Sequence, residues 1–241
     1  MSDIWSLLSR RTHPALPLVT YVNSLDGSRT ELSATSVSNA GAKIANAFVM
    51  EFDAEPGTRI GLALPWHWQR ATWLAGVWSS GCIAVVDEAE MHTCHMIVTD
   101  EMSCAALIDQ GFSDILVVSV HPFGLPITTQ LPSGCRDVTI DVRNQPDSLL
   151  VGGNFATATA LEIKGTTFSQ TELLARATER AREQNISAGS RVVLVESDLS
   201  ELDSWIAPLA LPLAISGSVL MTDVYSPERA ATEGVTARIV S

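Results

Sequence analysis

Apolar positions recur along the chain in two spacings, and the two spacings alternate from segment to segment. Short runs rich in β-branched residues, such as residues 18–22 and 59–64, are typical of strands. In the segment that follows Ser33, apolar residues instead return every three or four positions, which predicts a helix with one buried face. Strands alternating with helices predict an α/β fold, with largely parallel sheets covered by helices on both faces.

The same patterns give residue ranges for the other elements. Ser169 and Glu172 have the spacing of a capping box and predict a helix start, with Phe168 and Leu173 as its hydrophobic staple. Ser226 followed by proline predicts a short last helix. Further strands are expected at residues 29–32, 82–86, 95–99, 115–120, 138–142, 191–196, 216–222 and 235–240, and further helices at 66–79, within 100–111 and after Ser200.

One region interrupts this alternation. Residues 122–147 contain four prolines, two glycines and many polar residues, which is typical of a long connection. We therefore predict two α/β lobes. The first covers residues 1–145 and contains a hairpin, helices and parallel strands, and the second covers residues 146–241.

Composition and charge narrow the choice of partners. The 241 residues carry a net charge of −12, and only two of the basic residues are lysines, Lys43 and Lys164. An acidic chain without a basic stripe is a poor match for nucleic acid or an anionic membrane, so we expect a small molecule or another protein as partner, with self-association left open.

Other features of the chain predict a cytoplasmic protein. No signal peptide or membrane span is expected, because the apolar stretch at residues 205–221 is divided by Pro208 and Pro212. The four cysteines lack Cys-x-x-Cys spacing, which favours reduced thiols.

Three blocks in the first hundred residues resemble a known family. These are Thr20-Tyr21 with Asp26-Gly27 and Glu31-Leu32-Ser33, then residues 56–65 (PGTRIGLALP), then residues 75–86 (AGVWSSGCIAVV). Their order and spacing are similar to those of the AMP-binding acyl-CoA synthetases of the adenylate-forming superfamily. The resemblance implies the fold of the N-terminal domain of those enzymes.

The family's phosphate loop, approximately TSGTTGxPKG, has a degenerate counterpart in residues 156–165 (ATATALEIKG). The resemblance implies cofactor-binding roles for the matching residues, which are Thr157, Thr159, Lys164 and Gly165. Two glycines of the family motif are replaced by Ala158 and Leu161. Such a loop uses glycine to aim backbone N–H groups at phosphate, so these changes predict weak ATP or AMP binding at most. The alternative is an ordinary surface connection with a solvated Lys164.

The resemblance also locates the family's metal-binding glutamate and catalytic lysine beyond the phosphate loop. No part of this chain matches them, so we expect the C-terminal catalytic domain to be absent, with no catalytic residue, no metal and no resident cofactor assigned.

We therefore interpret the chain as a pseudoenzyme, a non-catalytic acyl-CoA synthetase-like protein that acts as a ligand- or protein-binding module. Two alternatives remain: a nucleotide-binding ligase-type enzyme completed by a partner chain, and a purely structural interaction module.

Two other groups of residues are candidates for binding sites. His92, Cys94, His95 and Cys104 invite a zinc interpretation, but their spacing does not match common zinc patterns, so packing or surface roles are favoured. Trp66-His67-Trp68 lies where a strand meets a helix. Because ligands gather at the carboxyl ends of strands, these rings could line a pocket, although core packing is the plainer interpretation.

Overall fold

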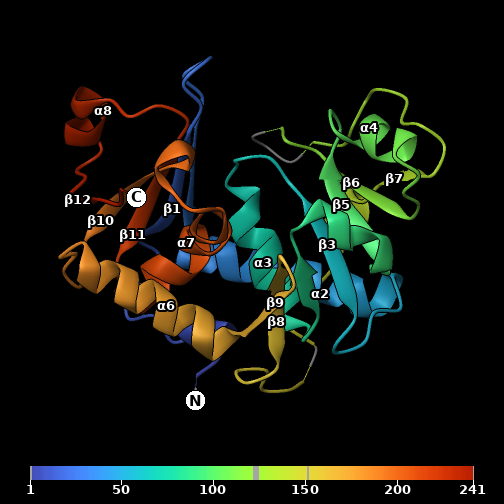
Figure 1. The fold of residues 1–241 in the computed structure, drawn as a ribbon, viewed down its shortest axis with the longest axis horizontal. Helices are drawn as coiled ribbons and strands as arrows, with labels where there is room; N and C mark the ends of the chain where they lie inside the picture. Colours follow the sequence, from blue (N-terminus) through green and yellow to red (C-terminus); the bar gives the residue numbers. More distant parts are fainter. Residues whose placement is uncertain (1, 122–124, 151, 241) are drawn as a thin grey trace.

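The structure is a computed structural model of the chain, and it describes residues 2–121, 125–150 and 152–240. Two mainly parallel sheets with helices packed against them confirm the predicted α/β class (Figure 1). The strands are β1 (Pro17–Val22), β2 (Arg29–Ser33), β3 (Arg59–Ala63), β4 (Ile83–Val85), β5 (Met96–Asp100), β6 (Ile115–Val118), β7 (Cys135–Asp137), β8 (Thr159–Ile163), β9 (Thr166–Ser169), β10 (Arg191–Val195), β11 (Ser218–Thr222) and β12 (Ala237–Arg238). The helices are α1 (Ile4–Ser9), α2 (Ala34–Glu51), α3 (Gln69–Ser79), α4 (Cys104–Asp109), α5 (Thr139–Arg143), α6 (Gln170–Glu183), α7 (Glu201–Ala214) and α8 (Pro227–Thr232), with 3-10 turns η1 (Glu88–Thr93) and η2 (Glu196–Asp198).

Each sheet combines strands from distant parts of the chain. The five-stranded sheet has the order β12-β10-β11-β1-β2, so the first two strands of the chain share it with the last three, through the pair β1 and β11. The seven-stranded sheet has the order β7-β6-β5-β3-β4-β8-β9. Neither the predicted lobe at residues 1–145 nor the one at 146–241 therefore contains a whole sheet.

Helices α2 and α3 lie between the two sheets and pack tightly on each other (Figure 1). Gly76 on α3 allows this approach, since a Cβ there would lie 2.3 Å from Cγ2 of Ile44 on α2. Trp78, fully buried on α3, donates its indole N–H to the carbonyl oxygen of Ala160 in β8 at 2.8 Å. The helix pair therefore forms the centre of the core.

Capping residues start several helices where the sequence places them. The Ser169 hydroxyl and the Glu172 carboxylate form the complete capping box of α6. Ser33, Ser200 and Ser226 accept backbone N–H groups at the starts of α2, α7 and α8. Within the described part of the chain, no helix is both long enough and apolar enough to cross a membrane.

The region between β6 and β8 differs from the prediction. The strand expected at residues 138–142 is the helix α5, and the short strand β7 precedes it. The reason is local: the Asp137 carboxylate accepts the backbone N–H of Thr139 at 2.8 Å, which turns the chain after β7. Residues 122–124 of the predicted connection lie outside the described residues. The last expected strand shrinks to β12, and α3 begins at Gln69 rather than at residue 66.

Candidate functional site: a closed hairpin turn and an apolar cavity

Residues 156–165 form neither the loop of the family motif nor an ordinary surface connection along their whole length. Residues 159–163 are strand β8, which pairs in parallel with β4 and antiparallel with β9. Only Lys164 and Gly165 connect β8 to β9, with φ of 50° and 69°. Positive φ at both central residues is the signature of the type I′ turn, whose twist matches that of a two-residue hairpin.

This hairpin separates the residues that were predicted to bind phosphate. Thr157 is exposed before β8, Thr159 begins the strand, and Lys164 with Gly165 follows its other end. At the rise of an extended strand, Thr159 and Lys164 lie roughly 16 Å apart. The structure therefore brings together Lys164 and Gly165 only, and the two threonine hydroxyls lie too far away to share one phosphate with them.

Two carboxylates of the chain already occupy the polar groups of the turn. The Lys164 amine lies 2.5 Å from Oε2 of Glu201, and this contact raises the pKa of Lys164. The backbone N–H of Gly165 donates to Oε1 of Glu90 at 2.6 Å. Leu161, at a position where the phosphate loop that the sequence resembles has glycine, is fully buried in the core of the sheet. The Lys164 amine and the Gly165 N–H therefore both have partners within the chain.

Trp66, His67 and Trp68 join the carboxyl ends of strands from both sheets. The Trp66 indole N–H donates to the Thr222 carbonyl oxygen at the end of β11, 3.1 Å away. The His67 ring lies 4.9 Å from that of Tyr21 on β1, edge to face. Trp66 is buried, whereas His67 and Trp68 are half-buried. These three residues therefore form a bridge between the sheets, in which core packing dominates.

Burial determines the protonation of His67. Desolvation lowers the pKa of this histidine to about 4, because the charged imidazolium loses water that the neutral ring does not need. Its Nδ1 is buried and has no hydrogen-bond partner. The ring is therefore neutral at pH 7.

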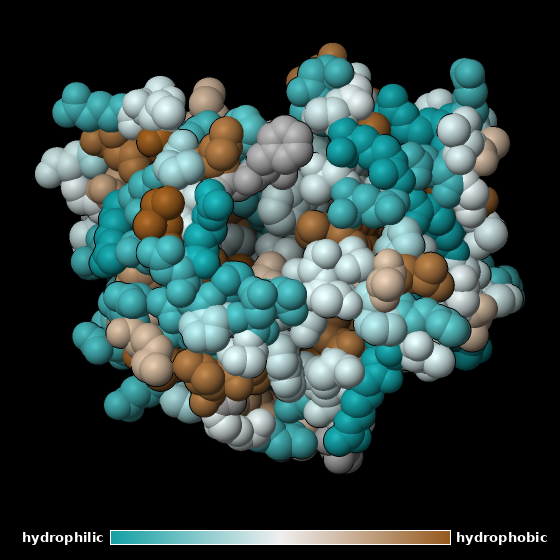
Figure 2. All heavy atoms as spheres, turned by 180° about the vertical axis from the view of Figure 1, so that it is seen from behind, coloured by the Kyte–Doolittle hydropathy of each residue, from teal (hydrophilic) through white to brown (hydrophobic). Residues whose placement is uncertain are grey.

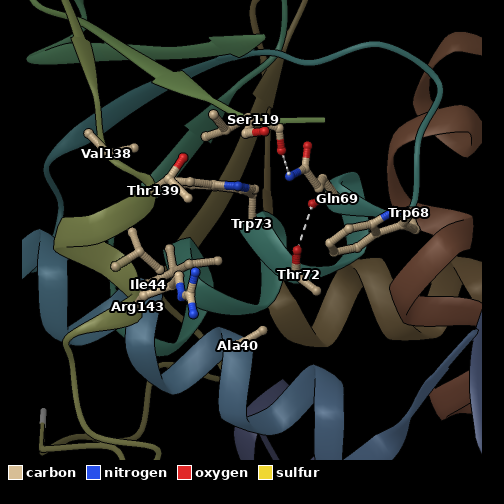
Figure 3. Close-up of a pocket in the computed structure, with 12 residues that line it drawn as sticks. Ala40, Ile44, Trp68, Gln69, Thr72, Trp73, Ser119, Val138, Thr139 and Arg143 are labelled. Atoms are coloured by element: carbon tan, nitrogen blue, oxygen red, sulfur yellow. Dashed lines mark hydrogen bonds between the residues drawn. The ribbon is translucent and has the colours of Figure 1, made fainter. Parts of the chain in front are cut away.

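An apolar cavity of about 270 Å³ opens beside this bridge (Figure 3). It lies between α2, α3, the carboxyl end of β6 and α5. Its lining residues are Ala40, Ile44, Trp68, Gln69, Thr72, Trp73, Val118, Ser119, Val138, Thr139, Val142 and Arg143. Arg143 is the one charged side chain in this set, which contains no histidine, cysteine or carboxylate. The lining can bind a ligand, but it supplies neither a nucleophile with a base nor an acid–base pair.

Hydrogen bonds fix part of the cavity wall. The Gln69 amide nitrogen donates to the Ser119 carbonyl oxygen at 2.8 Å, as the dashed line in Figure 3 shows. This bond orients the amide, so its Oε1 is the acceptor that remains, and that atom is buried without a partner. Thr139 Oγ1 is buried without a partner as well. Sequence reasoning missed this site because it assigned residues 138–142 to a strand; Asp137 two positions before Thr139 was the available signal for a turn.

The histidines and cysteines weighed as zinc ligands have other neighbours. The His92 ring stacks on Phe112 with a centroid distance of 4.2 Å, and Cys104 is buried in the cluster around Ile115. Burial raises the pKa of the Cys94 thiol to about 11. Among the described residues, no group of three or more histidine, cysteine or acidic side chains could hold a metal ion.

The sequence was compared with protein families and with known proteins. No protein-family model matches the chain. A Mycobacterium tuberculosis protein described as a TIGR03089 family protein is 34% identical over 142 residues, which are 58% of this chain and 58% of that protein.

Among solved structures, an acyl-CoA synthetase of Brucella canis has a TM-score of 0.76 at 14% identity, over 98% of this chain and 46% of that one. The N-terminal domain of FACL13 from Mycobacterium tuberculosis has a TM-score of 0.72 at 12% identity, over 99% of this chain and 62% of that one. ATP-bound MatB from Rhodopseudomonas palustris has a TM-score of 0.70 at 12% identity, over 99% of this chain and 49% of that one. The chain spans about half the length of most of these proteins, and its fold is that of the N-terminal region of acyl-CoA synthetases.

Proposed function

We propose that this chain, with the N-terminal fold of acyl-CoA synthetases, is a binding module that does not catalyse adenylation. The observation that carries the proposal is the two-residue turn at Lys164 and Gly165. Its lysine and its N–H group are paired with Glu201 and Glu90, within the chain itself.

The physical chemistry of phosphate binding supports this proposal. A phosphate cradle needs several backbone N–H groups that converge on one anion, together with cations that face it. In the turn, the Gly165 N–H is engaged by a carboxylate, and the amine of the exposed Lys164 is paired with Glu201. The two carboxylates would also repel a triphosphate, in a chain whose net charge is −12. Weak nucleotide binding, suggested by the fold shared with ATP-bound MatB, is the lesser proposal for this turn.

Two assays test the proposal on the purified chain. Isothermal titration with ATP, AMP, CoA and an acyl-adenylate measures binding, and ATP–pyrophosphate exchange measures adenylation. We expect no exchange above background. Exchange that depends on the chain would overturn the proposal.

The alternative of an enzyme completed by a partner chain makes a different prediction for Lys164→Ala. A catalytic lysine would make this variant lose an activity that the partner restores to the wild type. We expect the variant and the wild type to be equal in ATP binding and in exchange, with and without cell extract as a source of partner. Loss of activity in the variant alone would favour the enzyme.

A purely structural module is the second alternative, and the exposed apolar side chains bear on it. Leu25 is 94% exposed and Met102 is 83% exposed, each in a loop at the carboxyl end of a strand. Figure 2 shows the hydrophobic side chains of the rear face in separate small patches between hydrophilic ones. Broad structural interfaces need larger continuous surfaces, and the face in Figure 2 does not present one. Light scattering after size exclusion would reveal a stable assembly if one forms.

A further inference from the structure

We infer that the cavity between α2, α3 and α5 docks a segment of a partner protein that inserts one aromatic or aliphatic side chain and pairs an adjacent acidic side chain with Arg143. This inference rests on the proposed binding function. It assigns that function to this cavity and names the class of partner that the cavity binds.

The cavity suits one apolar side chain. Its walls include the indoles of Trp68 and Trp73 and the aliphatic side chains of Ile44, Val138 and Val142. The cavity has a volume of about 270 Å³. We call the partner side chain that inserts into the cavity the anchor. Its burial removes apolar surface of both proteins from water. Trp and Arg at such a position are typical of the residues that dominate binding energy at protein interfaces.

The charge at the rim favours an acidic neighbour. Arg143 is exposed, and its guanidinium has no ion pair or hydrogen bond with any residue that the structure describes. The other arginine of this region, Arg136, is paired with Asp141 at 2.9 Å. In Figure 3 the Arg143 side chain lies beside Ile44 at the edge of the cavity. A guanidinium binds a carboxylate through two parallel hydrogen bonds, so an aspartate or glutamate beside the anchor would form an ion pair with Arg143.

The backbone that carries Arg143 is anchored in place. Lys43 on α2 donates to the carbonyl oxygens of Arg143 and Gln145 at 3.0 and 2.5 Å. Asn46, one turn further on, donates to the carbonyl oxygens of Pro146 and Ser148 and accepts the N–H of Leu150 at 2.9 Å. The rim is thus pre-organised, which lowers the entropy that binding must overcome.

The surroundings favour a chain segment over a free small molecule. Ile140, three positions before Arg143 on α5 and therefore on the same side of that helix, is 47% exposed. A molecule of the size of the cavity would leave this side chain in water. A peptide that continues past its anchor can cover it, as in other grooves that recognise one anchor and its neighbours.

The test uses the full chain and an array of capped hexapeptides. Each peptide carries one Phe or Leu and one Asp at every relative position, and each has a matched peptide with Asn in place of Asp. Binding is measured by isothermal titration and by tryptophan fluorescence. We expect a subset of Asp peptides to bind about tenfold more tightly than their Asn partners.

Three variants make the outcome specific. Arg143→Met should weaken the Asp peptides about tenfold and leave the Asn peptides unchanged, while Arg182→Met, on the exposed side of α6, should change neither. Ala40→Phe should fill the cavity and abolish both, with circular dichroism confirming its fold. Equal binding of Asp and Asn peptides, or no effect of Arg143→Met, would overturn the inference that the partner carries an acidic side chain beside its anchor.

Absence of binding across the array would overturn the docking inference as a whole. So would binding of a capped single phenylalanine as tight as that of any peptide. Adenylation activity in the exchange assay would instead contradict the proposed function, so the two failures can be told apart.

Discussion

Lys164 and Arg143 are both exposed cations, yet their surroundings differ. Lys164 matches the lysine of a phosphate loop by sequence, but in the structure it lies in a two-residue turn with its amine 2.5 Å from Glu201. Arg143 matches no motif, and within the described residues its guanidinium has no partner beside an open apolar cavity. The comparison teaches that a retained residue type indicates a site only when its neighbours leave it free to bind.

Backbone structure explains the difference between the two regions. The turn is the closed end of a paired hairpin, so its conformation is determined by β-pairing on both sides of β8. The cavity is space left where α5 meets the tightly packed α2 and α3. The first region is saturated by the fold, and the second is left open by it. Four predictions follow this contrast, in order of decreasing effect.

Gly76→Val should disrupt the cavity region most strongly. Its side chain would collide with Ile44, which also lines the cavity, because a Cβ at this position lies 2.3 Å from Cγ2 of Ile44. Overpacking of this kind costs about 3 kcal/mol of unfolding free energy. Urea denaturation measures the loss, and Gly152→Val serves as control, since a Cβ at Gly152 meets nothing within 4 Å. A loss in Gly76→Val no larger than in the control would show that α2 and α3 can separate freely.

Acidification should weaken the bridge beside the cavity through His67. Its pKa is lowered from 6.5 to about 4 in the folded chain, so between these values the unfolded chain binds a proton that the folded chain does not. Stability therefore falls as the pH drops through this window, by about 2 kcal/mol between pH 7.5 and 5. His67→Gln should flatten this part of the pH profile of unfolding, whereas the exposed His13→Gln should not. If His67→Gln lost as much stability between pH 7.5 and 5 as the wild type, His67 would not be the group that causes this loss.

Gly165→Ala should strain the turn without any collision. The residue has φ of 69°, and a Cβ there would have only Glu90 Oε1 near it, at 3.9 Å. A left-handed alanine costs about 1 kcal/mol, which thermal unfolding can resolve. Gly152→Ala provides the control, because the backbone at Gly152 does not adopt positive φ. If Gly165→Ala were as stable as the wild type, the two-residue turn would not be the conformation in solution.

The double variant Glu90→Gln and Glu201→Gln should have the smallest effect. It removes both carboxylates that pair with the turn, but it leaves Thr159 and Lys164 roughly 16 Å apart along β8. We therefore expect no gain in ATP binding over the wild type by titration. A clear gain would mean that charge, and not the geometry of the hairpin, closes the turn to phosphate.

Local signals in the sequence predicted much of the secondary structure. The capping box at Ser169 and Glu172 marked the start of α6, and the apolar run at residues 59–64 marked β3. Such elements depend on residues a few positions apart, which a sequence displays directly. The prediction failed at α5, where the Asp137 carboxylate accepts the Thr139 N–H and the strand-like residues 138–142 turn into a helix.

The sequence by itself determined the class of fold, the acidic balance of the chain and the absence of glycine at positions 158 and 161. Only the tertiary structure decided that residues 159–163 form a strand, because this depends on partners in β4 and β9 rather than on the residues themselves. It alone also decided that strands from both ends of the chain share the five-stranded sheet and that Arg143 borders a cavity. The physical reason is range: helix caps and turns are set within a few residues, whereas strand pairing and cavities arise between segments far apart in the sequence.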